Sequence, residues 1–298
     1  MSGQLKEVRD RIKSVKSTQQ ITKAMKMVSA AKLRKAQDAI VALRPYSDKL
    51  DKMLRNILSN IEGEASSSFG QERPVERVLV VPVTSNRGLC GAFNSNIVKE
   101  AVKVIEEYDS VRQAGNLTIM PIGKKGYDGT KDAFKDCTFI TDHIELFSDL
   151  SFDNVSTVSN FIMEQFKEGG YDKIFVTYGR FKNAALQFAE ATQFLPVEKL
   201  ETTGGQEESK RKADYIFEPS KEQLLENLIP SILQTTFQKF LLDTNASEHG
   251  ARMTAMDKAT ENAEEMVKEL KITYNKARQE AITKELSEIV GGAAALGG

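Results

Sequence analysis

The sequence is poor in the residues that build disulfide frameworks and metal centres. Its 298 residues include two cysteines, Cys90 and Cys137, and two histidines, His143 and His249. Two cysteines rule out a disulfide scaffold and fit a reducing compartment. The histidines are far apart in the sequence and fall in different predicted domains, so we expect neither a metal site nor a histidine-based relay. We expect no cofactor.

Long apolar runs and targeting signals are also missing. No stretch approaches the ~18 apolar residues of a membrane span, so we expect no direct span. The first residues, MSGQLKEVRDRIK, have no apolar core and no small-residue cleavage site. They are therefore not expected to be a secretory signal, and they are too regular for a transit peptide.

Motifs for phosphate binding and catalysis are absent as well. The sequence contains neither GxxxxGK[ST] nor GxGxxG. The stretch SNRGLCGAFN lies at a predicted strand-to-helix junction, where a helix N-terminus can hold a phosphate. A tight turn is the better explanation of Gly88 and Gly91, and a small buried hydrophobe that of Cys90. No group of residues satisfies the requirements of a catalytic site, so we expect a protein that is not itself an enzyme.

Positive charge is concentrated at one end of the chain. The whole sequence has a net charge of -1, yet residues 1–44 carry 11 basic and 3 acidic side chains. A basic stripe of this kind can meet nucleic acid, anionic lipid or an acidic protein surface. It can equally be a solvated helix face, and the residues alone leave these alternatives open.

Residues 4–44 are predicted to form one helix with a coiled-coil seam. The seam residues recur at alternating spacings of three and four: Leu5, Val8, Ile12, Val15, Gln19, Thr22 and Met25. The stretch from Ile21 to Gln37 is rich in alanine and basic residues and lacks a broad apolar stripe. Pro45 is expected to interrupt the helix, and residues 47–61 to continue it after a kink.

The middle of the chain, residues 75–218, changes to alternating strands and helices. Strands are predicted at 77–83, 117–122, 137–142, 173–178, 186–195 and 214–217. Helices are predicted at 94–108, 124–134 and 152–166. This alternation is typical of an α/β domain with a mostly parallel sheet and right-handed crossovers.

From residue 221 to 298 the sequence is helical again, with an early interruption at Pro230. A second seam is predicted at Met256, Ala259, Ala263, Met266, Leu270 and Ala277. Sixty residues of helix would reach roughly 90 Å, which exceeds the diameter of one domain. We therefore predict three parts: an N-terminal coiled-coil helix at 1–60, a central α/β domain at 75–218, and a C-terminal coiled-coil helix at 221–298. The two terminal helices are expected to form an antiparallel coiled coil in which the longer C-terminal helix extends beyond its partner.

The block YNKARQEAITKELSEIV, Tyr274 to Val290, lies where the partner helix is expected to have ended. A lone polar helix in water is marginal. Either this segment frays, or another molecule surrounds it.

The sequence closely resembles the gamma subunit of the F-type ATP synthase, in a bacterial form. Three blocks carry the resemblance: IKSVKSTQQITKAMKMVSAAKLRKAQ, SNRGLCGAFNSN, and ASEHGARMTAMDKATENAEEMVKEL followed by YNKARQEAITKELSEIVGGAAA. The two terminal blocks are highly specific, and the glycine-containing block is moderately so. No insertion like the chloroplast redox segment is present, so Cys90 and Cys137 do not match the family's regulatory thiols.

The resemblance implies a non-catalytic central-stalk rotor with a Rossmann-like central domain. In that family the coiled coil turns inside a ring of three alpha and three beta subunits. The globular domain contacts the epsilon subunit and seats the shaft on the membrane c-ring. Ion flow, usually of protons, is thereby coupled to ATP synthesis or hydrolysis in the ring. The implied location is the cytoplasmic face of the bacterial inner membrane, as a peripheral part of the complex, with no nucleic-acid partner.

Five residues match family positions that contact the beta subunits, and two more, Thr283 and Glu285, lie in the same block. The implied contacts are Met25, Arg87, Arg252, Arg278, Gln279, Thr283 and Glu285. Arg87 matches an arginine that faces an acidic loop, and Arg278 and Gln279 match the contact with a catch loop. Two other classes compete with this interpretation: a coiled-coil adaptor with an α/β head, and a nucleotide-binding enzyme that uses the α/β domain. The sequence does not give the coupling ion, the direction of turnover, the coiled-coil register or the mode of regulation.

Overall fold

The structure is a computed structural model that describes residues 2–59, 69–70, 73–197 and 221–296. The chain divides into two compact units, residues 1–30 with 252–298, and residues 31–251. Two long helices, α1 (Ser2–Ser59) and α6 (Lys221–Leu296), each contribute to both units. The predicted strand at 214–217 lies outside the described residues.

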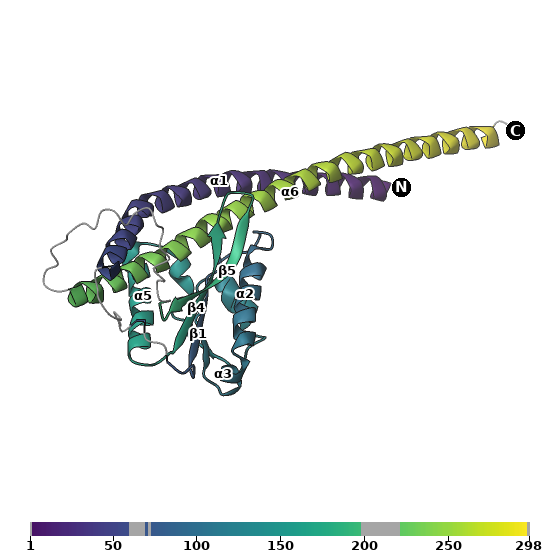
Figure 1. Ribbon diagram of the computed structural model, residues 1–298. Coiled ribbons are helices and arrows are strands. Elements are labelled where there is room, and N and C mark those ends of the chain that lie inside the picture. Colours follow the sequence, from purple (N-terminus) through teal and green to yellow (C-terminus); the bar gives the residue numbers. More distant parts are fainter. Residues whose placement is uncertain (1, 60–68, 71–72, 198–220, 297–298) are drawn as a thin grey trace. The chain divides into compact units, whose positions relative to one another are not determined.

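The first unit is an antiparallel pair of helices (Figure 1). Arg9 of α1 donates a hydrogen bond to the hydroxyl of Tyr274 of α6 at 2.8 Å. Nearer the other end of the pair, the Oγ1 atoms of Thr22 and Thr260 lie 2.7 Å apart in a hydrogen bond. Residue numbers rise along one helix as they fall along the other, so the two helices run antiparallel, as the sequence predicted.

The seam between these helices is narrow. On α1 its best-buried members are Thr22, 8% exposed, and Ser29, 3% exposed. The remaining α1 members are half-buried, as predicted: Leu5, Val8, Ile12, Val15, Gln19 and Met25. On α6 the buried members are Met256, Ala263, Val267 and Ala281. Small and hydroxyl-bearing side chains in the seam let two helices approach closely, and they bury little apolar area.

Two predicted seam residues give way to their neighbours, Ala259 to Thr260 and Met266 to Val267. Met266 is 44% exposed, whereas its neighbour Val267 is 7% exposed. The seam runs 256, 260, 263, 267, 270, 274, 277 and 281, so the step after Ala263 is four residues. Alternating steps of three and four keep a stripe on one side of a helix. A step of three was predicted there because the alternating spacing was counted from Ala259, and the register of Thr260 was not visible from the sequence.

Neither proline interrupts its helix, contrary to the prediction. Pro45 lies within α1 and Pro230 within α6. Figure 1 shows α1 bending towards its C-terminal end, which agrees with the predicted kink and continuation. Proline removes one helical hydrogen bond and crowds the preceding turn. The second unit holds the helix on both sides of Pro45, because Leu33, Ala36 and Leu50 are all buried.

The second unit contains a five-stranded sheet in the order β3-β2-β1-β4-β5. The strands are β1 (Val78–Pro82), β2 (Leu117–Ile119), β3 (Thr138–Phe139), β4 (Lys173–Phe181) and β5 (Gln187–Leu195). Strands β1 to β4 are parallel, and β5 pairs antiparallel with β4. The order places β1 at the centre, where all five of its residues are buried. This mostly parallel sheet confirms the predicted fold class.

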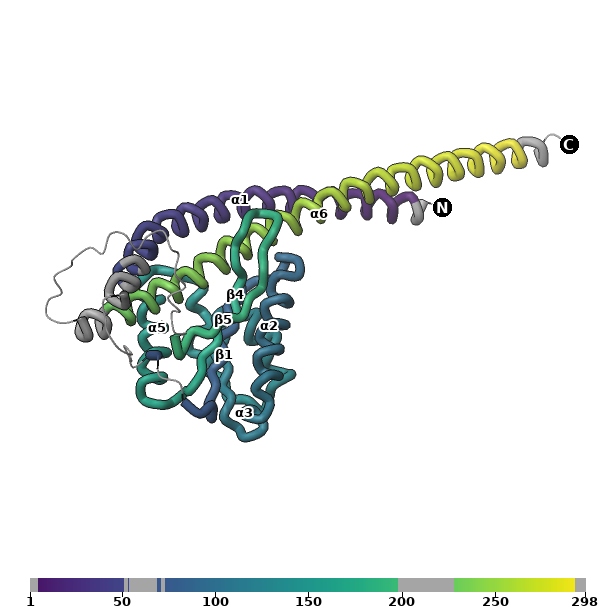
Figure 2. Tube along the Cα trace, in the orientation of Figure 1, coloured from purple at the N-terminus to yellow at the C-terminus, as the bar shows by residue number. Residues whose placement is uncertain are grey.

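Helices cover both faces of the sheet (Figures 1 and 2). On one face α5 (Phe152–Lys167) and the part of α6 around Phe237 pack against Leu79, Val81 and Ile174. On the other face α2 (Phe93–Glu107) and α3 (Asp109–Gln113) pack against Val78, Val80 and Ile119. Alternate residues of β1 therefore point into two separate apolar cores, which explains its uninterrupted run of apolar residues.

The remaining elements are short. Helix α4 spans Lys124–Thr130 and stops before the predicted end at Phe134. A 3-10 helix, η1, spans Ile144–Ser148. Among the residues that the structure describes, no helix is long and apolar enough to cross a membrane.

Candidate partner-binding surfaces

The C-terminal part of α6 has no partner from α1. The paired residues Arg9 with Tyr274 and Lys26 with Asp257 give the register, in which the two residue numbers add to about 283. Ser2, the first residue of α1, therefore lies level with Ala281 of α6. Ala281 is the last buried residue of the seam, and all residues from 282 to 292 are exposed. We call the segment from Ile282 to Leu296 the α6 extension; Figure 1 shows it passing the N-terminus of α1.

The α6 extension carries an exposed apolar stripe. Its members are Ile282, Leu286, Ile289 and Val290, with exposed fractions of 47%, 57%, 67% and 67%. Spacings of four, three and one place these side chains on one side of a helix. Charged residues occupy the other side, where Lys284 and Glu288 lie 3.8 Å apart. Four large apolar side chains on one side of an unpaired helix are typical of a surface that another protein covers.

The segment from Tyr274 to Val290 was predicted to be a polar helix, and its apolar stripe was not predicted. Four of the predicted contact residues nevertheless lie beside it. Arg278, Gln279, Thr283 and Glu285 are all exposed. Residues three, four and seven positions apart are neighbours on a helix surface, so these four flank the apolar residues. The geometry brings polar and apolar candidates together on one face of about three and a half turns.

The other two predicted contacts on the long helices are less accessible. Met25 is half-buried in the seam. Arg252 is 9% exposed, although its residue type favours solvent. A partner would reach only part of either side chain.

A second candidate surface is the loop between β1 and α2. Ser85 and Cys90 are buried there, whereas Arg87 and Leu89 are exposed, Leu89 by 65%. Leu89 has a φ of 65°, in the left-handed region that a branched apolar residue rarely adopts. Gly91 also has a positive φ, of 61°, as its predicted role in a tight turn requires.

Hydrogen bonds below the loop hold this conformation. The backbone N–H of Ser85 donates to Oδ1 of Asn94 at 3.0 Å, and the hydroxyl of Ser85 donates to the carbonyl oxygen of Arg87 at 2.7 Å. The amide group of Asn94 also donates to Sγ of Cys90 at 3.2 Å. An exposed leucine held at a costly φ by a fixed base indicates a surface shaped for contact.

Two titratable residues for which no role is predicted, Cys137 and His143, are half-buried in the α/β unit. Burial raises the pKa of Cys137 to about 11, so its thiol stays protonated. His143 packs against Phe161 with ring centroids 5.6 Å apart, and burial lowers its pKa. Within the described residues, no group of three or more His, Cys, Asp or Glu side chains could hold a metal ion.

Comparison with known proteins agrees with the fold. A family model described as ATP synthase matches residues 4–296. The ATP synthase gamma chain of Cytophaga hutchinsonii is 53% identical over 98% of both chains, and that of Flavobacterium johnsoniae is 51% identical over 99% of both. A chain of the Euglena gracilis mitochondrial ATP synthase is 24% identical with a TM-score of 0.66, covering 99% of this chain and 95% of that one. At that identity the structural match speaks for the fold alone. The two relatives share half of their residues with this chain over its length, and the chain therefore belongs to the family of ATP synthase gamma chains.

Proposed function

We propose that this chain is the central-stalk rotor subunit of a bacterial F-type ATP synthase. It would turn inside a ring of three alpha and three beta subunits and couple ion flow through a membrane c-ring to ATP synthesis or hydrolysis. The observation that carries this proposal is the α6 extension, an unpaired helix with a continuous apolar stripe. A surrounding sleeve of protein would remove that stripe from water on the sides that α1 leaves open.

The contacts with the beta subunits are proposed at the residues named from the sequence. Arg278, Gln279, Thr283 and Glu285 flank the apolar stripe on the α6 extension and the turn before it. Arg87 stands on the fixed loop after β1. Met25 and Arg252 would contribute the parts of their side chains that remain accessible. Exposed ion pairs are typically worth ~0–1 kcal/mol each, and such weak contacts suit a shaft that must leave each position.

The rotor itself is proposed to catalyse nothing. Nucleotide chemistry would take place in the ring, and the shaft would act by contacting the three beta subunits differently. A binding partner shifts a conformational equilibrium only through its differential affinity for the states. One helix end with an apolar stripe on one side and charges on the other is asymmetric about its axis, so it can supply that difference.

The remaining partners and the location are proposals of the same kind. The α/β domain at 75–218 would contact an epsilon subunit and seat the shaft on the c-ring. The helices at 1–60 and 221–298 would form the shaft. The complex would hold this chain at the cytoplasmic face of the inner membrane as a peripheral subunit.

Co-expression tests the proposal. The chain, produced with alpha and beta subunits of its own organism, should purify as a stoichiometric complex with ATPase activity. The chain alone should neither hydrolyse ATP nor bind it tightly. A chain that stayed out of the complex would refute the rotor proposal, and clear turnover by the isolated chain would favour an enzyme instead.

A further inference from the structure

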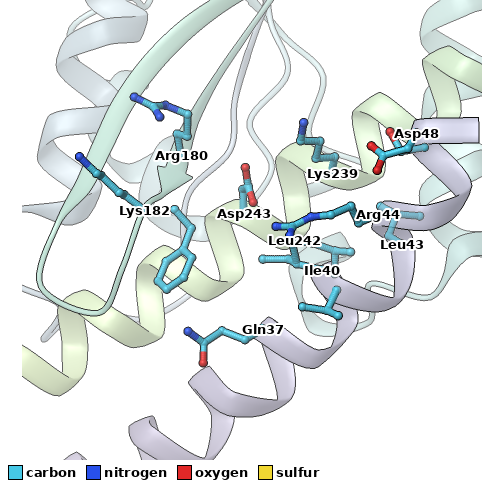
Figure 3. Close-up of a pocket in the computed structure, with 13 residues that line it drawn as sticks. Gln37, Ile40, Leu43, Arg44, Asp48, Arg180, Lys182, Lys239, Leu242 and Asp243 are labelled. Atoms are coloured by element: carbon cyan, nitrogen blue, oxygen red, sulfur yellow. The ribbon is translucent and has the colours of Figure 1, made fainter. Parts of the chain in front are cut away.

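Three elements of the second unit enclose a pocket of about 480 Å³. Its walls are the C-terminal half of α1, the end of β4 with the residue after it, and a turn of α6. Figure 3 shows Arg44 reaching from α1 towards the turn of α6 that carries Lys239 and Asp243. A volume of this size is in the range of small-molecule sites.

Basic side chains come from every wall of this pocket. Arg44 belongs to α1, Arg180 to β4, and Lys239 to α6, while Lys182 follows the last residue of β4. Arg180 is fixed by an ion pair with Glu190 at 2.6 Å. In the part of the chain that the structure describes, no ion pair involves Arg44, Lys182 or Lys239. The lining contains only two acids, Asp48 and Asp243, so its charge favours an anion.

Asp243 differs from the other charged groups because it is buried. It is 8% exposed, and it lies one helical turn after Lys239. Among the described residues no hydrogen bond satisfies its carboxyl group. Its carboxyl oxygens are not among the fully buried atoms without a partner, so solvent in the pocket reaches them and a ligand there can donate a hydrogen bond to them.

We propose that this pocket binds inorganic phosphate, which still carries a proton at neutral pH. The basic side chains would bind the anionic oxygens, and the carboxylate of Asp243 would accept a hydrogen bond from the P–OH group. This inference does not depend on the rotor proposal.

The proposed chemistry distinguishes phosphate from sulfate. Near neutral pH inorganic phosphate keeps at least one proton, whereas a phosphate monoester, with a pKa of about 6, has largely lost its own, and sulfate has no proton to donate. Both anions satisfy the basic side chains, but only the protonated phosphate satisfies Asp243. The Asp243 carboxylate instead repels sulfate, because neither partner supplies a donor.

The discrimination should also depend on pH. Burial raises the pKa of Asp243 to about 6, against the opposing charges of Lys239 and Arg180. Glu190 on β5 acts in the same direction as burial, and Arg44 on α1 opposes it. The hydroxyl of Tyr178, also on β4, stays protonated because its pKa is raised to about 12. Below about pH 6 the carboxyl group of Asp243 becomes a neutral donor, and sulfate binding should approach phosphate binding.

Titration calorimetry on the full-length chain tests the proposal. Inorganic phosphate and sulfate are compared at about pH 7.5 and constant ionic strength, because salt screens exposed charges. Phosphate should bind at least about tenfold more tightly than sulfate, the size of one charge-assisted hydrogen bond. Glycerol phosphate is the second arm: it has lost its P–OH proton at this pH, so it should bind no more tightly than sulfate, and binding as tight as that of inorganic phosphate would overturn the proposal.

Two variants and a control make the test specific. Asp243→Asn, which keeps the shape of the side chain, should reduce the difference between phosphate and sulfate to within about twofold. Lys239→Ala should weaken both anions about tenfold. Lys103→Ala, an exposed lysine paired with Glu100 on α2, should change neither. Equal binding of phosphate and sulfate by the unaltered chain would overturn the proposal, as would the absence of phosphate binding, or an Asp243→Asn variant that keeps the full discrimination.

Discussion

The apolar stripe of the α6 extension gives the sharpest test of how this chain meets its partners. Leu286 and Ile289 are 57% and 67% exposed. Complete burial of such a side chain is worth ~1.5–3 kcal/mol, so covering the exposed fraction is worth about 1–2 kcal/mol for each residue. Replacing both with glutamine should weaken binding to the alpha–beta ring by about 2–4 kcal/mol, or about 30- to 1,000-fold.

The isolated chain should tolerate the same double substitution. Neither side chain is buried by the rest of the chain, and glutamine is a good helix former. The thermal unfolding of Leu286→Gln/Ile289→Gln, followed by circular dichroism, should therefore match that of the unaltered chain. Lys284→Gln/Glu288→Gln provides the control, because this pair lies on the opposite side of the same turns. Affinity for a preformed ring is the measurement. If the apolar variant bound as tightly as the control, the stripe would not be a covered surface.

Three further outcomes are expected. Arg278→Ala with Gln279→Ala should reduce complex assembly or the ATPase activity of the purified complex. Circular dichroism should show that the α/β unit stays folded. Normal coupled activity would remove both residues from the proposed contacts. Asp172→Ala should destabilise the α/β unit by about 2–4 kcal/mol in urea unfolding. The reason is that Oδ2 of Asp172 accepts hydrogen bonds from the backbone N–H groups of Glu76 and Arg77, each at 2.9 Å. An unchanged urea midpoint would mean that water replaces the carboxylate. Asp243→Asn should raise the melting temperature at pH 7 and leave it nearly unchanged near pH 4, and a variant less stable than the parent at pH 7 would contradict the assigned cause.

The sign of the last prediction follows from the direction of the shift. Burial raises the pKa of Asp243 to about 6, above the ordinary value of 3.8. The folded chain therefore holds this proton over a pH range in which the unfolded chain has lost it. Folding stability falls as the pH rises between these two values, and the whole penalty is present at pH 7. Asparagine carries no charge at any pH, so it removes the penalty only where aspartate is ionised.

Much of the fold could be predicted because periodicity reports local structure. The uninterrupted apolar run from Val78 to Val81 indicated a strand buried on both faces, and helices cover both faces of it. The seam through Leu5, Val8 and Ile12 indicated a paired helix. Periodicity was weakest where the seam uses threonine and serine. Met266 was preferred to Val267 for that reason, since Thr260 gives no apolar signal from which to count.

The candidate sites were less predictable, because they depend on what the chain leaves uncovered. Arg278 and Gln279 were identified only through the family resemblance. The apolar stripe at Leu286 and Ile289 was visible in the sequence, but its exposure depends on where α1 ends relative to α6. The pocket around Asp243 joins three segments that lie far apart in the sequence, and no local pattern brings Arg44 and Lys239 together.

The composition of the seam connects the packing of the coiled coil to the proposed role of its end. Thr22, Ser29, Ala263 and Ala281 bury little apolar area, so the two helices hold each other with modest energy. Beyond Ala281 even that energy is lost, and a single helix of about 15 residues is marginal in water. The α6 extension would therefore gain most of its stability from the protein that surrounds it. A shaft built in this way stays slender enough to fit inside a ring, and its end is ordered by the partners whose states it is proposed to bias.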